Sequence, residues 1–215
     1  MGTTRLEIYQ RAILHCKQTP VTSLGDANEA RRLCDVHYAP MLQCIMEAGF
    51  WTHAMRTTEI TVNAGVTPAF GYAHAHDMPS DMVRKYAVSA SETMQPPLDY
   101  QAGGTAYLIE GGYLWADSTP LYLRYTSSDA NYGLDLTRWP ERLTEAATLE
   151  LAYRIVPKLT GSSELRNELM NLKTQALGKA NTFEALQQPA RRARAGRWVS
   201  DRFAATRTGA DYRRA

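Results

Sequence analysis

The feature that most constrains the fold is a change in hydrophobic period along the chain. Apolar residues recur every three or four positions before about residue 54 and again after about residue 139, which indicates amphipathic helices. Between these blocks, segments 57–62 and 121–126 alternate and are rich in β-branched or aromatic residues, which is typical of strands. This order predicts an α+β protein, in which four helices form a bundle and a small antiparallel β-module is inserted between them.

Local signals set the expected ends of the first two helices. The period predicts a first helix over residues 4–17 and a second that runs to Gly49, which is placed to end it. Asp26 and Glu29 have the spacing of a capping box, so we expect Asp26 to cap the second helix. Pro40 lies inside this helix and is expected to kink it.

The later elements have equally local signals. The tripeptide 110–112, Glu-Gly-Gly, between apolar segments predicts a tight hairpin, and residues 86–89 form a weaker strand. Pro140 suits the first turn of a third helix, and residues 160–163 read as a turn and cap before a fourth. We expect Leu151 and Leu169 to lie in the bundle core.

Composition divides the chain further. We expect residues 1–54 and 133–188 to form the bundle, residues 55–132 the β-module, and residues 189–215 an extended basic C-terminal arm. Residues 188–215 carry eight arginines and two aspartates, a net charge of +6 against +2 for the whole chain, which leaves −4 for the preceding residues. The arm is too polar to bury a core of its own, and its charge suits a different partner from that of the body.

Several functional classes are disfavoured by composition. No apolar run approaches the ~20 residues that span a membrane, and the first residues lack the apolar core of a secretory leader. Three cysteines, Cys16, Cys34 and Cys44, are too few and too widely spaced for a disulfide framework or a zinc site, so we expect buried, reduced thiols. We therefore expect neither a membrane partner nor a cofactor.

Two clusters suggest chemistry. His74 and His76 would point the same way on a strand, with Asp77 following, which would suit a metal site and a small hydrolase. The simpler interpretation is a polar strand edge, because no third ligand has suitable spacing. Cys34, with His37 and His53, suggests nucleophilic catalysis, but no glycine-flanked nucleophile motif is present. We expect neither a metal site nor an enzyme.

Two further patterns suggest binding. Tyr122, Tyr125 and Tyr132 with Arg124 could stack on single-stranded nucleic acid, although cross-strand aromatic packing is the interpretation that we favour. The arm fits two partners by composition, since arginines with spaced aromatic residues bind phosphates or dock on acidic protein surfaces. Its candidate docking residues are Arg191, Arg192, Arg194, Arg197, Trp198, Arg202, Phe203, Arg207 and Tyr212.

The order of several short motifs resembles that of a known family. Residues 20–24 form a P-x-x-S-L loop, residues 26–49 the capped helix, and residues 51–54 a W-x-x-A stop. Together they resemble the amino-terminal signature of the head-to-tail adaptor proteins of tailed bacteriophages, also called the tail tubular protein A family. Segments 70–84, 120–125 and 151–162 are similar to later elements of that family, so the likeness extends from about residue 7 to 186. Many members carry Asn-Phe after the tryptophan, where this chain has Thr52 and His53.

The resemblance implies a non-enzymatic virion protein at the head–tail junction, made in the host cytoplasm. Subunits of such a protein assemble as a homo-oligomeric ring, commonly dodecameric, beneath the portal protein. The ring extends the channel for genomic DNA and offers a docking platform for a nozzle or tail-tube protein. The resemblance also implies that the arm reaches onto the portal. The alternative is a nucleic-acid-binding protein that uses the arginine-rich arm.

Overall fold

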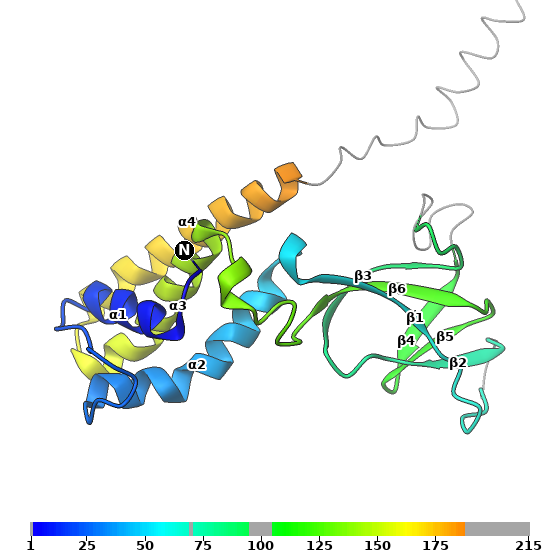
Figure 1. Cartoon of the computed structure of the whole chain (residues 1–215), viewed down its shortest axis with the longest axis horizontal. Helices are drawn as coiled ribbons and strands as arrows, with labels where there is room; N and C mark the ends of the chain where they lie inside the picture. The colour runs from blue at the N-terminus through cyan, green and yellow to red at the C-terminus, as the bar shows by residue number, and fades with distance from the viewer. Residues whose placement is uncertain (1, 69–70, 95–104, 188–215) are drawn as a thin grey trace, which may run out of the picture. The chain divides into compact units, whose positions relative to one another are not determined.

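The computed structural model describes residues 2–68, 71–94 and 105–187, and it confirms a mixed α+β fold (Figure 1). Residues 1–185 belong to one compact unit, and beyond it the structure describes only Leu186 and Gln187. The helices are α1 (Arg5–His15), α2 (Glu29–Ala48), α3 (Glu141–Leu159) and α4 (Ser163–Gln187), with short 3-10 helices η1 (Thr52–Ala54) and η2 (Leu136–Arg138). The strands are β1 (Met55–Ile60), β2 (His74–Asp77), β3 (Met82–Ser89), β4 (Tyr107–Glu110), β5 (Tyr113–Ala116) and β6 (Leu121–Ser127). No described helix is long and apolar enough to cross a membrane.

The prediction that Asp26 caps α2 is wrong. The cap is Asn28, whose side chain accepts a hydrogen bond from the backbone N–H of Ala30 at 2.8 Å. Asp26 instead accepts hydrogen bonds from the backbone and the hydroxyl groups of both Thr22 and Ser23. These bonds, those from Ser23 foremost, lower the pKa of Asp26 to about 2. Asp26 therefore fixes the loop before the helix.

Gly49 ends α2 as predicted, but for a steric reason. Its φ of −153° is available to any residue. A Cβ at this position would meet the ring of Trp51 at 2.7 Å and would also overlap the side-chain oxygen of Asn181 in α4. Glycine thus permits close contact between the end of α2 and α4, and the helix continues through Pro40 before it ends.

The turn between α3 and α4 follows the sequence signals. At the other end of α3, Pro140 occupies the N-cap position, one residue before the first turn in which it was predicted, and it makes no side-chain cap hydrogen bond. Between α3 and α4, Gly161 adopts a left-handed φ of +65°. The hydroxyl of Ser162 then accepts a hydrogen bond from the backbone N–H of Leu165 at 3.2 Å, as an N-cap does. Leu151 and Leu169 are both buried, which confirms their predicted place in the core.

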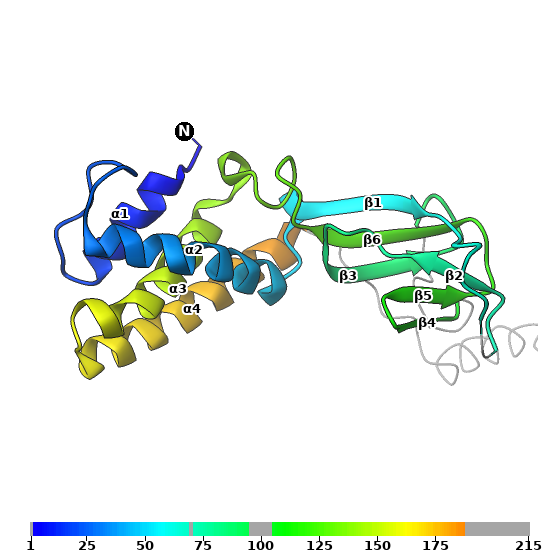
Figure 2. The ribbon, with the colours of Figure 1, turned by 90° about the horizontal axis from the view of Figure 1, so that it is seen from below.

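One apolar cluster draws side chains from all four helices. The helices α2 and α3 lie side by side (Figure 2), and α1 contacts both. Two tryptophans complete this cluster: the indole of Trp51 donates to the Ile45 carbonyl and that of Trp139 to the Gly133 carbonyl, each at 2.8 Å. Each buried indole ring therefore has a hydrogen-bond partner for its single polar group, the Nε1–H.

Charged side chains connect neighbouring helices at the margin of this cluster. Asp35 in α2 accepts hydrogen bonds from Arg5 at 2.7 Å and from the Tyr9 hydroxyl at 2.8 Å, both in α1. Glu150, buried in α3, pairs with Arg154 at 2.7 Å and with Lys173 of α4 at 2.9 Å. A buried carboxylate is tolerated because both of its oxygens have a cationic partner.

The six strands form two antiparallel sheets of three strands, in the orders β1-β6-β3 and β2-β5-β4. The two sheets contribute to one small apolar cluster, with Leu121, Leu123 and Val88 from the first and Leu114 and Ala116 from the second. An isolated β-bridge between Val62 and His76, with flanking backbone hydrogen bonds, links the segment after β1 to β2. The predicted strand over 57–62 is thus displaced by two residues, and the weak strand 86–89 is the end of a longer one.

The β4–β5 hairpin confirms its sequence signal. Gly111 and Gly112 both have positive φ, +63° and +83°, the combination that a two-residue turn of the favoured handedness needs. Glycine adopts both angles without strain, which is consistent with the Gly-Gly pair.

Candidate interaction surface

The predicted docking residues of the arm lie outside the described residues. This applies to Arg191, Arg192, Arg194, Arg197, Trp198, Arg202, Phe203, Arg207 and Tyr212. The structure therefore bears on the other candidates, which all fall in its described part.

His74 and His76 lie on β2, on the same side as Leu114 and Ala116, their partners in β5. Their rings are 6.3 Å apart. His76 is buried, with Nδ1 3.4 Å from the Ile60 carbonyl oxygen, and burial lowers its pKa. Within residues 2–68, 71–94 and 105–187, no three His, Cys, Asp or Glu side chains are grouped so as to hold a metal ion.

The Cys34 thiol and the His53 imidazole are not hydrogen-bonded to each other. Cys34 is buried, and burial raises the pKa of its thiol to about 12, the opposite of activation. Both ring nitrogens of His53 are buried and lack a hydrogen-bond partner among the described residues, so neither bonds the thiol, and His37 is half-buried on α2. Cys16 is likewise buried, with its pKa raised to about 11, whereas Cys44 is only half-buried, contrary to expectation.

The proposed tyrosine platform is divided between two sides of a sheet. Tyr122 and Arg124 alternate with Tyr125, which is buried and donates its hydroxyl proton to Asp81 at 3.0 Å. Tyr132 lies beyond the strand, with the guanidinium of Arg56 5.1 Å from its ring centroid. These residues therefore cannot stack on one strand of nucleic acid.

Arg124 instead belongs to a different group, which we call the basic face: Phe50, Arg84, Tyr86 and Arg124. The guanidinium of Arg84 lies 4.2 Å from the Phe50 ring centroid, and that of Arg124 lies 5.4 Å from the Tyr86 ring centroid. The two rings meet edge to face at 5.0 Å. Both arginines are exposed, and neither forms an ion pair with any residue that the structure describes. Stacking fixes the two guanidinium groups without neutralising them.

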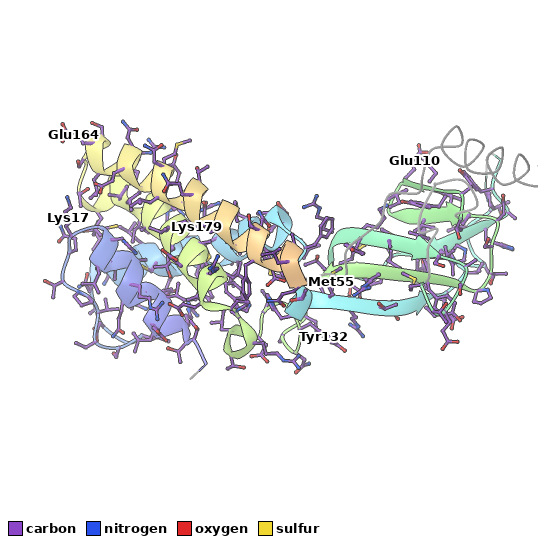
Figure 3. The ribbon with its side chains drawn as sticks, turned by 90° about the horizontal axis from the view of Figure 1, so that it is seen from above. Lys17, Met55, Glu110, Tyr132, Glu164 and Lys179 are labelled. Atoms are coloured by element: carbon purple, nitrogen blue, oxygen red, sulfur yellow. The ribbon has the colours of Figure 1, made fainter. Side chains whose placement is uncertain are left out.

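The second sheet carries a contrasting group on its outer side, which we call the acidic face: Asp77, Leu108, Glu110, Tyr113 and Trp115. Tyr113 in β5 pairs with Asp77 of β2 on one side and with Glu110 of β4 on the other, so the two carboxylates flank one aromatic ring. Glu110 is the last residue of β4 (Figure 3). Trp115 packs edge to face against Tyr113 at 5.9 Å, and Leu108 is 39% exposed.

The structural roles of two carboxylates, those of Asp81 and Glu184, were not predicted from the sequence. Asp81 accepts from Tyr125 and Ser127 and pairs with Arg56 at 3.1 Å. Glu184 is only 3% exposed and accepts from the backbone N–H and hydroxyl of Thr52, at 2.8 and 2.7 Å. A signal for Glu184 did exist, since it continues the apolar spacing of Ala176 and Ala180 along α4.

Neither a protein-family model nor a curated protein matches this chain. A function must therefore be inferred from the residues that carry the sequence resemblance and from the arrangement of the two faces.

Proposed function

We propose that this protein is a non-enzymatic head-to-tail adaptor of a tailed bacteriophage. Made in the host cytoplasm, its subunits form a ring, dodecameric in the resembling family, beneath the portal at the head–tail junction of the virion. In this proposal the four helices act as one bundle, the sheets as an inserted module towards the nozzle or tail-tube protein, and residues 189–215 as an arm that clamps the portal. The ring extends the channel for genomic DNA.

The observation that carries the proposal is the place of the family-like motifs in the fold. Asp26 braces the loop before α2, and Trp51 fills the helical core. Asp81 fastens the end of the first sheet, and Ser162 caps α4. Each motif therefore has a structural role, as expected for a family defined by assembly rather than by catalysis.

A cavity of about 260 Å³ between α1 and α3 gives further support. It is lined by Arg11, Leu14, His15, Glu145 and Thr148. The Thr148 hydroxyl donates to the Thr144 carbonyl at 2.7 Å, and Arg11 pairs with Glu7 and Glu141. Arg11 thus links α1 to α3 through Glu141, and the Thr148 hydroxyl is bonded within α3 and not to His15, as a nucleophile would be.

The net charge of the body also suits a channel. Residues before the arm carry −4 in total, and a neutral or acidic lumen would let DNA pass without binding its phosphates. A structure of the ring checks this expectation directly. Rows of arginines lining the bore would contradict it.

The decisive experiment tests the arm in assembly. We expect a chain truncated after Gln188 to fold, as measured by circular dichroism, but to fail to join portal-containing heads in a reconstitution assay. Changing Arg191, Arg192, Arg194 and Arg197 together to lysine is a second test variant, because it keeps the charge but removes the planar fork that binds carboxylates in bidentate fashion. We expect this variant to weaken joining as well.

The outcome also decides between the two candidate functions. The alternative, a nucleic-acid-binding protein, is favoured by the charge of +6 on residues 188–215. The alternative predicts that the truncated protein joins heads normally. It also predicts that the full chain binds DNA, that this affinity falls steeply with salt, and that the change to lysine preserves it. These results together would replace the adaptor proposal with the alternative.

A further inference from the structure

We propose that the basic face of one copy binds the acidic face of the next copy, so that subunits associate head to tail through their sheets. This inference rests on the proposed ring and names the surfaces that form it. Arg84, Asp77 and Arg124 fall within segments that resemble the family, but the resemblance assigns them no role in subunit contact. The inference comes from the charges that the two sheets leave unpaired on their outer sides.

The basic face is prepared to bind carboxylates. Arg84 is held by its stacking on Phe50 and by a hydrogen bond of 3.2 Å from Nη1 to the Glu47 carbonyl oxygen. Arg124 is held by the Tyr86 ring. Their remaining N–H groups are available for bidentate bonds to carboxylates, at a reduced entropic cost because the side chains are already ordered.

The acidic face offers matching groups. Asp77 accepts a hydrogen bond from Asn63 at 2.9 Å, but neither Asp77 nor Glu110 pairs with a cation in the described ranges. The half-buried Tyr113 and the exposed Leu108 add aromatic and apolar surface beside them, whereas Trp115 is buried behind Tyr113 and supports its ring. Aromatic and arginine anchors with complementary charge are the usual chemistry of protein interfaces.

The position of the two faces determines the type of contact. The inner sides of both sheets contribute to one apolar cluster, so their outer sides are directed away from each other. Pairing two basic faces, or two acidic ones, would place like charges together. A basic face against an acidic face leaves one of each free on the resulting pair, and such a heterologous contact continues until a ring closes.

A nucleic acid is a poorer occupant of the basic face. Glu59 lies directly across from Tyr122, two positions along β6 from Arg124. Partial burial and the nearby carboxylates of Glu59 and Glu92 raise the pKa of Tyr122, which places both acids at this end of the sheet. A phosphate backbone that ran along the sheet would meet these acids, whereas a protein carboxylate binds locally.

The test uses the purified full chain and three double variants in sedimentation velocity over a range of concentrations. One variant reverses the basic face (Arg84→Glu with Arg124→Glu), and one reverses the acidic face (Asp77→Lys with Glu110→Lys). The control, Arg32→Glu with Lys179→Glu, makes the same charge change as the first variant at exposed helical residues. Circular dichroism checks that each variant folds. If the variant with both arginines reversed fails to fold, the single substitution Arg124→Glu takes its place.

We expect each reversed variant alone to associate about tenfold more weakly or worse, because its faces then carry like charges, and the control to associate as the wild type does. An equimolar mixture of the two reversed variants should regain association, since every contact then joins opposite charges again. A wild type that stays monomeric, reversed variants that associate normally, an equally weakened control or an unrestored mixture would each overturn the inference.

A twenty-residue oligothymidylate separates the remaining possibility. If reversing the basic face weakened oligothymidylate binding and left self-association intact, the face would be a nucleic-acid site and the inference would be wrong. The inference about the two faces is tested by self-association of the subunits. The adaptor proposal is tested by joining to portal-containing heads, which depends on the arm, so the two can fail independently.

Discussion

The helical region and the sheets are stabilised in different ways. In the helical region, one large apolar cluster contains bulky side chains with no exposed surface, among them Trp51, Tyr9 and Leu151. The cluster between the sheets is much smaller, and a polar network around Asp81 holds one end of the first sheet. The difference shows that hydrogen bonds to one carboxylate can fix strands where little apolar area is available.

The two regions also differ in what they leave unpaired. Charged groups between helices, such as Asp35 and Glu150, have cationic partners within the subunit. On the sheets, Arg84, Arg124 and Glu110 have no ion-pair partner among the described residues. Ion pairs within one subunit stabilise that subunit. Charged side chains that lack an ion-pair partner, on a surface held in place, are available to bind a second subunit.

The largest effect is expected in the helical core. Leu151→Ala removes a side chain with no exposed surface and should lower the free energy of unfolding by about 2–5 kcal/mol. Urea denaturation measures the change. Val36→Ala in α2, at a side chain 68% exposed, is the control and should change stability by less than about 0.5 kcal/mol. Equal losses in the two variants would show that the helical cluster does not carry the stability assigned to it.

In the sheets, the strongest single dependence should be on Asp81. Asp81→Ala leaves Tyr125, Ser127 and Arg56 without their acceptor and should cost about 1.5–3 kcal/mol. Hydrogen exchange should show faster opening of β3 and β6 than of α3. A loss of protection confined to α3 would contradict the contrast between the two regions.

Acid should act on the same network. Partial burial alone would raise the pKa of Asp81, but hydrogen bonds from Ser127, Tyr125 and Arg56 hold it below its usual value. The folded state therefore binds the proton less readily than the unfolded state, and stability is lost as the pH falls below about 4. A denaturation series from pH 5 to 2 measures this loss, and Asp81→Asn should make the profile less steep. An unchanged slope would show that other carboxylates dominate.

Local signals predicted the elements well, because the causes were local. Pro140 and the Gly111–Gly112 turn act within a few residues of themselves, so their sequence alone identified them. The cap of α2 was misassigned because Asp26 and Asn28 are both good capping residues two positions apart, and local sequence does not rank them.

The basic and acidic faces were harder to predict from the sequence. Strict alternation would place Arg84 on the same side as Val88, whereas irregularities in β3 direct Arg84 outwards and Val88 into the core. The acidic face depends on the pairing of three strands, which no local pattern reports. Surfaces that depend on the pairing register of several strands are therefore the hardest part of this molecule to predict from its sequence.

Between the two regions, a glycine should be irreplaceable. A Cβ on Gly133 would overlap the Ser127 carbonyl oxygen and the Met46 methyl group and would lie 3.2 Å from the Ala54 Cβ. Gly133→Ala should therefore cost about 1–3 kcal/mol through strain. Gly178→Ala in α4, where a Cβ meets nothing within 4 Å, is the control and should be neutral or slightly stabilising. Thermal unfolding compares the two, and an equal tolerance would show that the contact relaxes freely.

The smallest effect concerns His53, where this chain differs from the family that it resembles. Burial lowers the pKa of His53, with Glu184 and Asp135 opposing the shift and Arg138 adding to it. The unfolded state then binds a proton more readily than the folded state, so stability should fall as the pH drops below about 6.5. His15 and His76, whose pKa values burial also lowers, act in the same direction. Because both His53 ring nitrogens lack partners in the part of the chain that the structure describes, His53→Phe should raise stability at pH 7 by about 1 kcal/mol and reduce the slope between pH 6.5 and 5. A destabilised His53→Phe with an unchanged slope would mean that the imidazole has a partner, such as a bound water, that compensates its burial.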